Sequence, residues 1–202
     1  MTKMAKMYAY TISRDYGFAP NPFHGVCTLC TCKPKIRKAA EVGDWVIGVG
    51  SKPMTLNEHL IYAMRVTETM SFDLYWSDPR FACKIPNLRG SLKQAYGDNI
   101  YHTDPNTGQW IQEDSHHSYE GGRVNRDNLN RDTKPPRVLI SDDFIYFGEN
   151  APKIPSHLAG QFSRSIRNYK VNFSAELVRQ FIHWIRSYNT HGCCGRPVHW
   201  SA

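Results

Sequence analysis

The stretch Cys30–Val49, "CTCKPKIRKAAEVGDWVIGV", predicts a loop, a short helix, a turn and a strand in quick succession. Pro34 suits the first turn of a helix, because its fixed φ is helical and no intrahelical partner is lost there. The residues "KIRKAAEV" after it predict one or two helical turns, and Gly43-Asp44 predicts the turn that follows. Trp45–Val49 has the aromatic and β-branched content of a strand.

Upstream of this stretch, Tyr8–Ser13, "YAYTIS", predicts a first strand. The segment "DYGFAPNPF" then interrupts regular structure, because Gly17, Pro20 and Pro22 favour neither a helix nor a sheet. An aromatic, proline-rich loop therefore leads from the first strand to the cysteine-rich segment.

Downstream, Leu60–Thr69 predicts a third strand, and Arg137–Ser141 and Phe144–Gly148 predict a tight hairpin around Asp142-Asp143. A final helix begins after Ser174, which can cap it, and Gly192 follows as a stop signal. Its apolar residues recur at helical spacing and should dock on the strands, with Arg179 and Arg186 near solvent: Leu177, Val178, Phe181, Ile182, Trp184, Ile185 and Tyr188. This order of elements predicts an α+β fold.

Between these elements, Tyr101–Arg137 is dominated by polar residues and glycine. It has few apolar side chains whose burial could offset the conformational entropy that the segment loses when it becomes ordered. We expect a long excursion over the surface, ordered only by a ligand, with His116-His117 exposed to solvent.

The composition fits one domain, because the chain has 202 residues and 41% of them are hydrophobic. The formal net charge is +7, and the residues from Ala151 onward carry seven lysines and arginines against one acidic residue, Glu176. A localised basic face attracts phosphate, although such charge also serves solubility. No apolar run approaches the roughly 18 residues of a membrane span, and no signal peptide is recognisable, so we expect a cytoplasmic protein with reduced thiols.

The cysteines allow a metal site as a first interpretation. Cys27-x-x-Cys30 has the spacing of a zinc knuckle, and His24 lies close by. The second ligand pair is poor, because Cys193-Cys194 are adjacent and Cys83 stands alone, with His191 and His199 as the remaining candidates. We therefore predict no metal cofactor, with a structural zinc ion as the weaker alternative.

A nucleophilic cysteine is the second interpretation. Cys27, Cys30 or Cys32 lies near Lys33 and the predicted helix start, and both a cation and a helix N-terminus favour a thiolate. The sequence identifies no base beside the thiol: His24 is close in number only, and a general-base role for His116-His117 has no support.

A nucleotide pocket is the third interpretation and the one we favour. Tyr16, Phe18 and Phe23 supply rings on which a base can stack, and cationic residues that can hold phosphate follow them. These cations are Lys33, Lys35, Arg37 and Lys38. In the alternative interpretation the rings fill the core and the lysines solvate a helix.

Several single residues have two interpretations. Asp15 is a catalytic carboxylate or, preferably, holds the glycine- and proline-rich loop, and Asp44 most simply makes a turn. Trp45 and Trp76 could stack a base, yet a tryptophan in a strand usually lies in the core. Asp73 and Asp78 flank Trp76 and could accept hydrogen bonds from a base, or belong to a polar loop. We find no dinucleotide, phosphate-loop, H-E-x-x-H or zinc-deaminase motif.

Four segments together resemble the second of the nucleotide-modification-associated domains, a family of phages and bacteria found near DNA-base modification genes. They are "GFAPNPFHGVCTLCTCKPKIR", "GDWVIGVGSK", "MSFDLYWSDPRF" and "RVLISDDFIYFG". The resemblance covers roughly Tyr8 to Leu158 and leaves the final helix outside. It implies a role with modified nucleotides or nucleic acid. It also implies that Cys27 and Cys32, but not Cys30, belong to the family pattern, and this makes a zinc site less attractive.

A looser likeness concerns the layout of "GDWVIGVGS", "LIYAMRVTET" and "FDLYWSDPRF", which is similar to PUA-like barrels of the EVE and ASCH kind. Those domains resemble small open β-barrels that hold an extruded base, and extrusion exposes a base edge that a duplex hides. An analogy of arrangement does not by itself give a function.

We therefore expect a single α+β domain, residues 1–202, with a PUA-like core at 8–158 and a basic helical extension at 159–202. Its expected function is to bind a nucleotide or a modified nucleobase between the segments Tyr16–Arg37 and Phe72–Phe81. The alternatives are an enzyme that modifies a nucleobase or nucleotide, and a structural zinc module. The partner is a nucleotide or nucleic acid, and no membrane is involved.

The predicted site residues form three groups. The candidates for catalysis are Asp15, Cys27, Cys32 and Asp73. The candidates for nucleotide binding are Tyr16, Phe18, Asn21, Phe23, Lys33, Arg37, Trp45, Trp76 and Asp78. The candidates for phosphate or nucleic-acid contact are Lys35, Lys38, Arg164, Arg167 and Lys170.

Overall fold

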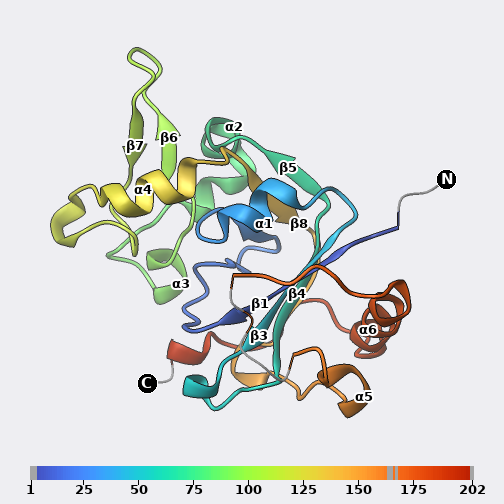
Figure 1. Cartoon of the computed structure of the whole chain (residues 1–202). Coiled ribbons are helices and arrows are strands. Elements are labelled where there is room, and N and C mark those ends of the chain that lie inside the picture. Colours follow the sequence, from blue (N-terminus) through green and yellow to red (C-terminus); the bar gives the residue numbers. More distant parts are fainter. Residues whose placement is uncertain (1–3, 163–165, 167, 201–202) are drawn as a thin grey trace.

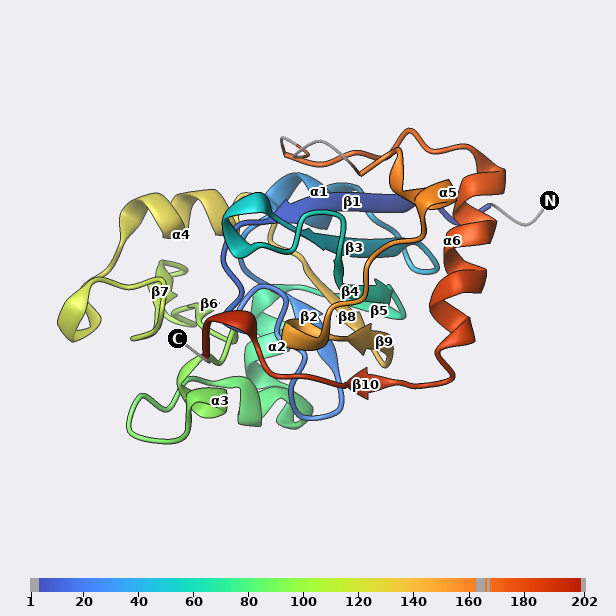
Figure 2. The ribbon, with the colours of Figure 1, turned by 90° about the horizontal axis from the view of Figure 1, so that it is seen from below.

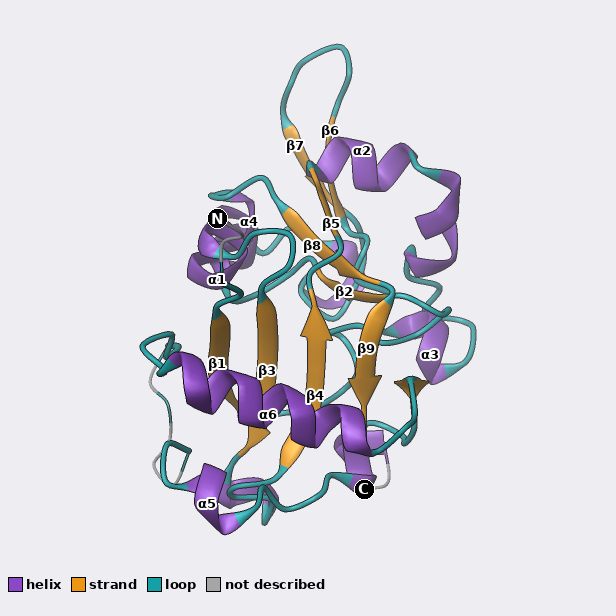
Figure 3. Ribbon diagram, turned by 90° about the vertical axis from the view of Figure 1, so that its right-hand side faces the viewer, coloured by secondary structure: helices purple, strands orange, loops and turns teal. Residues whose placement is uncertain are grey.

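A five-stranded mixed sheet organises the computed structural model, which describes residues 4–162, 166 and 168–200. Figure 3 shows its four longer strands side by side. In order across the sheet, the strands are β1 (Met7–Ile12), β3 (Trp45–Gly50), β4 (Leu60–Arg65), β9 (Asp143–Tyr146) and β10 (Gly192–Cys193). The outer pairs β1–β3 and β9–β10 are parallel and the inner pairs are antiparallel. The strands predicted at residues 8–13, 45–49 and 60–69 are therefore confirmed in position, although the last ends early.

A second, antiparallel sheet consists of β2 (Cys27–Leu29), β8 (Val138–Ser141) and β5 (Glu68–Met70). The chain turns from β4 into β5 and from β8 into β9, so it passes between the two sheets at two bends. The predicted hairpin at Asp142-Asp143 is wrong, because β8 pairs with β2 and β5 whereas β9 pairs with β4 and β10. The fold is α+β, as predicted, but the described strands form no closed barrel, and the PUA-like architecture is not confirmed.

Helix α6 (Ala175–Ser187) crosses one face of the large sheet (Figure 3). Its N-terminus is capped by the Ser174 side chain, which accepts a hydrogen bond from the Leu177 amide, as the sequence predicts. Val178, Phe181 and Ile185 are buried in one cluster with residues of β1, β3 and β4. Four such residues are Ala9, Ile47, Leu60 and Ala63.

The opposite face of the sheet is also covered. A second set of strand residues, including Tyr10, Tyr62 and Tyr146, packs with β2 and with helix α1 (Pro34–Ala39). Because both faces are buried, β1 and β3 are almost continuously buried rather than alternating between the core and solvent. Figure 2 shows α1 and α6 at different sides of this sheet.

The polar segment between residues 101 and 137 is built differently from the prediction. It contains the hairpin β6 (Tyr101–Thr103) and β7 (Trp110–Gln112), the 3₁₀ turn η3 (Glu120–Gly122) and helix α4 (Arg126–Thr133). The hairpin projects from the body of the molecule (Figure 1). The prediction of an excursion ordered only by a ligand is therefore wrong, because the segment has regular structure of its own.

A third hydrophobic cluster anchors this segment, with Leu129 of α4 packed among Phe72, Tyr75 and Tyr101. Helix α2 (Phe72–Ser77) contributes to this cluster. The remaining short helices are η1 (Lys52–Met54), η2 (Pro79–Lys84), α3 (Leu92–Ala95), η4 (Gly148–Asn150), α5 (Ser156–Ala159) and η5 (Val198–Trp200). No helix among the described residues has the length and apolar character that crossing a bilayer requires.

The C-terminal turn η5 is fastened to the loop that follows β1. The Val198 amide donates to Asp15 Oδ2 at 3.1 Å, and Trp200 Nε1 donates to the Tyr16 carbonyl at 3.0 Å. The Trp200 ring stacks on Phe23 with the centroids 5.1 Å apart. The end of the chain therefore supports the aromatic loop near its start.

Arg37 connects α1 to the segment after α4 and is fully buried. Its guanidinium donates to the carbonyls of Cys32, Asp132, Pro135 and Arg137 at distances of 2.5 to 3.1 Å. These bonds satisfy carbonyl groups that lie far apart in the sequence. Burial lowers the Arg37 pKa, and the nearby acidic groups oppose that change.

We predict that Arg37→Met lowers the free energy of unfolding by about 3 kcal/mol or more, because several buried carbonyls lose a charged donor at once. The matched control is Lys38→Met, which changes the next, exposed residue of α1 and should cost less than about 0.5 kcal/mol. Urea unfolding followed by circular dichroism measures both. Equal stability of the two variants would contradict this role of Arg37.

Candidate functional site

Cys32 lies in a tight left-handed turn between β2 and α1. Its φ is 57° and that of Lys33 is 39°, which are unfavourable values for residues with a side chain. The Cys32 amide donates to Asp132 Oδ1 at 3.0 Å, and its carbonyl accepts from Arg37 at 2.8 Å. The turn is therefore held in an uncommon conformation by partners from distant parts of the chain.

The Cys32 thiol faces a histidine that is itself oriented by a carboxylate. Cys32 Sγ lies 3.7 Å from His117 Nε2, and His117 Nδ1 lies 2.9 Å from Asp132 Oδ2. A nucleophile, a base within reach of it, and a group that orients the base form the arrangement of a catalytic triad. Three segments far apart in the sequence thus supply one chemical unit.

Two sets of hydrogen bonds position the base. The His117 carbonyl accepts from Gln112 Nε2 at 3.1 Å and from Asn128 Nδ2 at 2.9 Å. The His117 amide lies 3.3 Å from Ser115 Oγ, to which it donates. The loop after β7 is therefore fixed to both β7 and α4, and so is the backbone that carries the His117 ring.

Asp132 is fully buried on α4 and both of its oxygens are engaged. Oδ2 also accepts from the Tyr101 hydroxyl at 3.2 Å, and Oδ1 also accepts from Arg131 Nε at 3.0 Å. Burial alone would raise the Asp132 pKa, but the hydrogen bonds from His117 and Arg131 outweigh burial and lower it. Asp132 is thus held as a carboxylate.

The hydrogen bond that lowers the pKa of Asp132 raises the pKa of His117. Burial would lower the pKa of His117, but the hydrogen bonds to Asp132 and Cys32 raise it to about 9. His117 is therefore held as an imidazolium that lies beside the Cys32 sulfur.

A cavity of about 250 Å³ opens beside this triad. It is lined by Cys32, His117 and His116, by the rings of Tyr10, Tyr16 and Phe18, and by Lys33 and Arg14. Lys33 Nζ lies 4.3 Å from the centre of the Tyr10 ring, and burial lowers its pKa. The cavity therefore combines a nucleophile with aromatic walls and two cationic side chains.

The structure brings four of the predicted site residues together in this cavity. They are Tyr16, Phe18, Cys32 and Lys33. The second wall differs from the prediction: it comes from His116 and His117, not from Phe72–Phe81. Within the latter segment, Phe72, Tyr75 and Phe81 belong to the hydrophobic core.

Three predicted ligand residues are structural. Arg37 is fully buried and bonded to carbonyls, so its guanidinium does not reach a ligand. Asn21 is buried and accepts a hydrogen bond from Lys84 Nζ at 2.7 Å. Phe23 is buried against Trp200.

Three further residues also support the fold. Trp45 is buried in the core cluster under α6. Cys27 is fully buried, and burial raises its pKa, so its thiol is unsuited to catalysis. Asp15 is buried and accepts from the Tyr146 hydroxyl at 2.6 Å and from the amides of Gly17 and Val198, which confirms the loop-holding interpretation.

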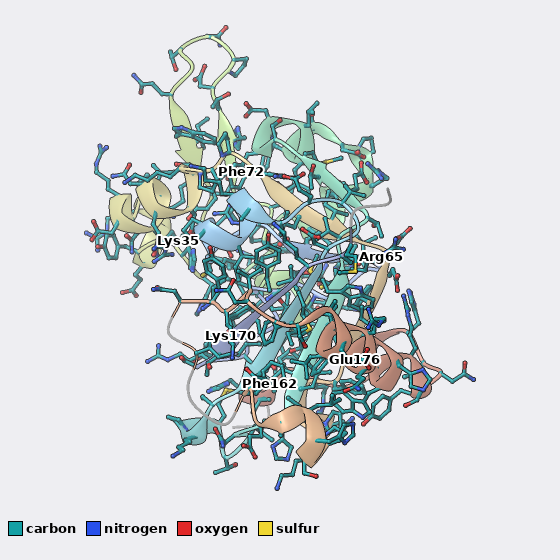
Figure 4. The ribbon with its side chains drawn as sticks, turned by 45° about the vertical axis from the view of Figure 1, so that its right-hand side comes forward. Lys35, Arg65, Phe72, Phe162, Lys170 and Glu176 are labelled. Atoms are coloured by element: carbon teal, nitrogen blue, oxygen red, sulfur yellow. The ribbon has the colours of Figure 1, made fainter. Side chains whose placement is uncertain are left out.

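The remaining predicted residues lie away from the cavity. Asp73 bonds to Thr103, Trp76 stacks on His102 and Asp78 pairs with Arg80. Lys170 Nζ donates to Gln161. Lys35 and Lys38 are exposed on α1, and Figure 4 labels Lys35 there. Arg164 and Arg167 lie outside the described residues.

Sequence reasoning missed His117 as the base and Asp132 altogether. His117 is buried, whereas the sequence predicted that both histidines would be exposed. The available signal was chemical: a polar segment that retains His116-His117 and, fifteen residues after His117, Asp132. Residue spacing could not place either of them beside Cys32.

The same three side chains also meet the distance requirement for a metal, since one ligand atom from each lies within 4.8 Å of the others. The hydrogen bonds argue against this use. Both carboxylate oxygens of Asp132 already accept hydrogen bonds, Oδ2 from His117 and Oδ1 from Arg131, so an ion would have to displace these partners. Cys27 and Cys30 point into different clusters and do not face one another.

The comparisons with known proteins agree with the resemblance seen in the sequence. The family described as nucleotide modification associated domain 2 matches residues 4–202. The chain belongs to this family. The match includes α6 and the C-terminal turn, which the sequence resemblance had left outside. No curated protein and no solved structure matches the chain significantly.

We predict a pH-dependent contribution of His117 to the stability of this family member. Because the folded-state pKa of about 9 lies above the ordinary value of 6.5, protonated His117 stabilises the fold fully below pH 6.5. This contribution is lost as the pH rises through 9. The stability difference between the wild type and His117→Gln should therefore shrink over this range.

Urea unfolding at several pH values measures this difference. His183→Gln, which changes an exposed histidine of α6, is the control and should leave the pH profile unchanged. A difference between wild type and His117→Gln that stays constant or grows with pH would contradict the proposed charge state.

Proposed function

We propose that the protein is an enzyme that transfers or hydrolyses an acyl group carried by a nucleotide, with Cys32 as the nucleophile. The observation that carries the proposal is the arrangement of Cys32, His117 and Asp132 at one end of an aromatic cavity. Such a triad serves acyl transfer on many unrelated folds. The family's association with nucleotide modification supports the choice of substrate.

In the first step, the Cys32 sulfur attacks the acyl carbon, and a carbon–sulfur bond forms. The attacking sulfur is the thiolate, and the Nε2 proton of the His117 imidazolium passes to the leaving amine or hydroxyl as the bond to it breaks. In the second step, water or an acceptor attacks the same carbon, gives its proton to His117, and releases the thiolate. Asp132 remains ionised throughout and stabilises the imidazolium.

The cavity supplies groups that suit a nucleotide. Tyr16, which stacks on Tyr96, and the largely buried Phe18 give the cavity an aromatic lining, and Lys33 and Arg14 offer positive charge for phosphate or for an oxyanion. His116 packs against both rings, with centroid distances of 5.0 Å to Tyr16 and 5.3 Å to Phe18. Burial and the charge of His117 lower the His116 pKa, so a neutral ring completes this wall.

The second candidate function is binding of a modified base without turnover. The aromatic walls favour it, because they suit a base whether or not the thiol reacts. This alternative assigns no chemistry to the buried Asp132–His117 pair or to the uncommon turn at Cys32. We therefore prefer the enzyme.

We predict that the protein deacylates N4-acetyl-deoxycytidine or N6-acetyl-deoxyadenosine 5′-monophosphate through an acetyl adduct on Cys32. Chromatography of the nucleotide and mass spectrometry of acid-quenched protein measure the two events. Cys32→Ala should abolish both. Asp132→Asn should lower turnover roughly 10³- to 10⁴-fold, because the carboxylate orients the base.

Cys83→Ser is the matched control, since it removes an exposed thiol far from the triad in sequence and should leave turnover unchanged. Turnover that persists in Cys32→Ala would overturn the assignment of the nucleophile. Binding of acetylated nucleotides without turnover would favour the second candidate function. Stoichiometric zinc in the purified protein, lost in Cys32→Ala, would favour a metal site.

A further inference from the structure

A groove of about 1170 Å³ lies between α1, α4 and the segment that joins β5 to α2. Pro34, Lys35 and Lys38 line it from α1. Arg131 lines it from α4, and Lys134 to Arg137 line it from the segment that follows. The predicted phosphate contacts Lys35 and Lys38 thus belong to a different surface from the cavity at Cys32.

The groove is strongly positive. Five cationic side chains line it (Lys35, Lys38, Arg131, Lys134 and Arg137) against one carboxylate, that of Asp127. Arg131 pairs with Asp132 and Arg137 pairs with Glu41. Lys35, Lys38 and Lys134 are exposed, and none of them forms an ion pair with a described residue. Three positive charges are therefore available to an anionic partner.

The lining between these charges is apolar. Met70, Leu74 and the prolines Pro34, Pro135 and Pro136 contribute to it, and 60% of Leu74 is exposed. A row of charges beside an apolar surface of aliphatic side chains and prolines suits a polymer that carries phosphates and the flat faces of unstacked bases. A duplex would bring its phosphates to the groove but would leave the apolar lining without a partner.

Two direct connections link this groove to the triad. Lys33 lines the cavity and the next residue, Pro34, lines the groove. Arg131 lines the groove while its Nε donates to Asp132 Oδ1 at 3.0 Å. A chain that follows the groove therefore passes beside the reactive site.

We infer that the groove holds a stretch of single-stranded polynucleotide whose neighbouring, unstacked base enters the cavity at Cys32. This inference rests on the proposed function of the cavity and extends it from free nucleotides to a polymer. An unstacked base is what an enzyme acting on a base requires, and a single strand provides it at the lowest cost.

The test uses the full chain with Cys32→Ser, so that binding is measured without turnover. Fluorescence anisotropy follows a labelled oligodeoxynucleotide of about 12 residues at several salt concentrations, in competition with the mononucleotide and with the duplex. The single strand should bind at least tenfold more tightly than either competitor.

The groove variant is K35Q/K38Q/K134Q, and the matched control K6Q/K52Q/K153Q removes the same charge from exposed lysines outside the groove. Three lost phosphate contacts should reduce the slope of log K against log salt by about 2, since each contributes roughly 0.7 for single strands. Affinity at low salt should fall at least tenfold in the groove variant and less than twofold in the control. Equal unfolding midpoints show that both variants fold.

Equal losses in the two variants, or none in either, would overturn the inference. Tighter binding of the duplex, of the mononucleotide or of an oligoglutamate peptide would also overturn it. The three groove substitutions are also made in the protein that retains Cys32, and its turnover of the acetylated mononucleotide is measured. This measurement separates the groove inference from the proposed function. If turnover persists while oligonucleotide binding fails the test, the groove inference is wrong and the proposed function stands.

Discussion

The burial of Arg37 is the constraint on which the rest of the structure depends. A guanidinium removed from water is costly unless its donors are satisfied, and here they bond to four backbone carbonyls. Two of those carbonyls belong to Cys32 and Asp132, which are 100 residues apart. Only a chain that brings both segments to α1 satisfies Arg37. The same bonds therefore stabilise the fold and assemble the triad.

A second buried cation, Lys84, stabilises the loop that leads from β1 to β2. Lys84 is fully buried and donates to the carbonyl and side-chain oxygens of Asn21 and to the Val26 carbonyl. Burial lowers its pKa, while the charge of Asp98 opposes this change. Because one cation holds the aromatic loop and the other holds the Cys32 turn, the left-handed residues there can persist at a cost of about 1–2 kcal/mol each.

Cationic side chains line two separate surfaces, the cavity and the groove. In the cavity, Lys33 and Arg14 lie beside aromatic rings and a thiol, where a single small group fits. In the groove, exposed lysines line an extended apolar surface that suits a chain. Asp132 stands between them, bonded to Arg131 on one side and to His117 on the other. The proposed reaction and the proposed binding of a polymer therefore lie on separate surfaces.

The sequence by itself determined the local elements: the strands at the start, the helix after Pro34, the capped helix α6, and a loop of rings and cations around Cys32. Periodicity and caps act over a few residues, so they are visible without the fold. Only the tertiary structure decided which cysteine meets a base, because His117 and Asp132 reach Cys32 through contacts spanning 85 and 100 residues. It also decided that Arg37 is buried while Lys38 is exposed, and that β8 and β9 join different sheets. A buried and an exposed cation have the same sequence pattern around them. Which of the two is buried depends on the distant segments that pack against the helix.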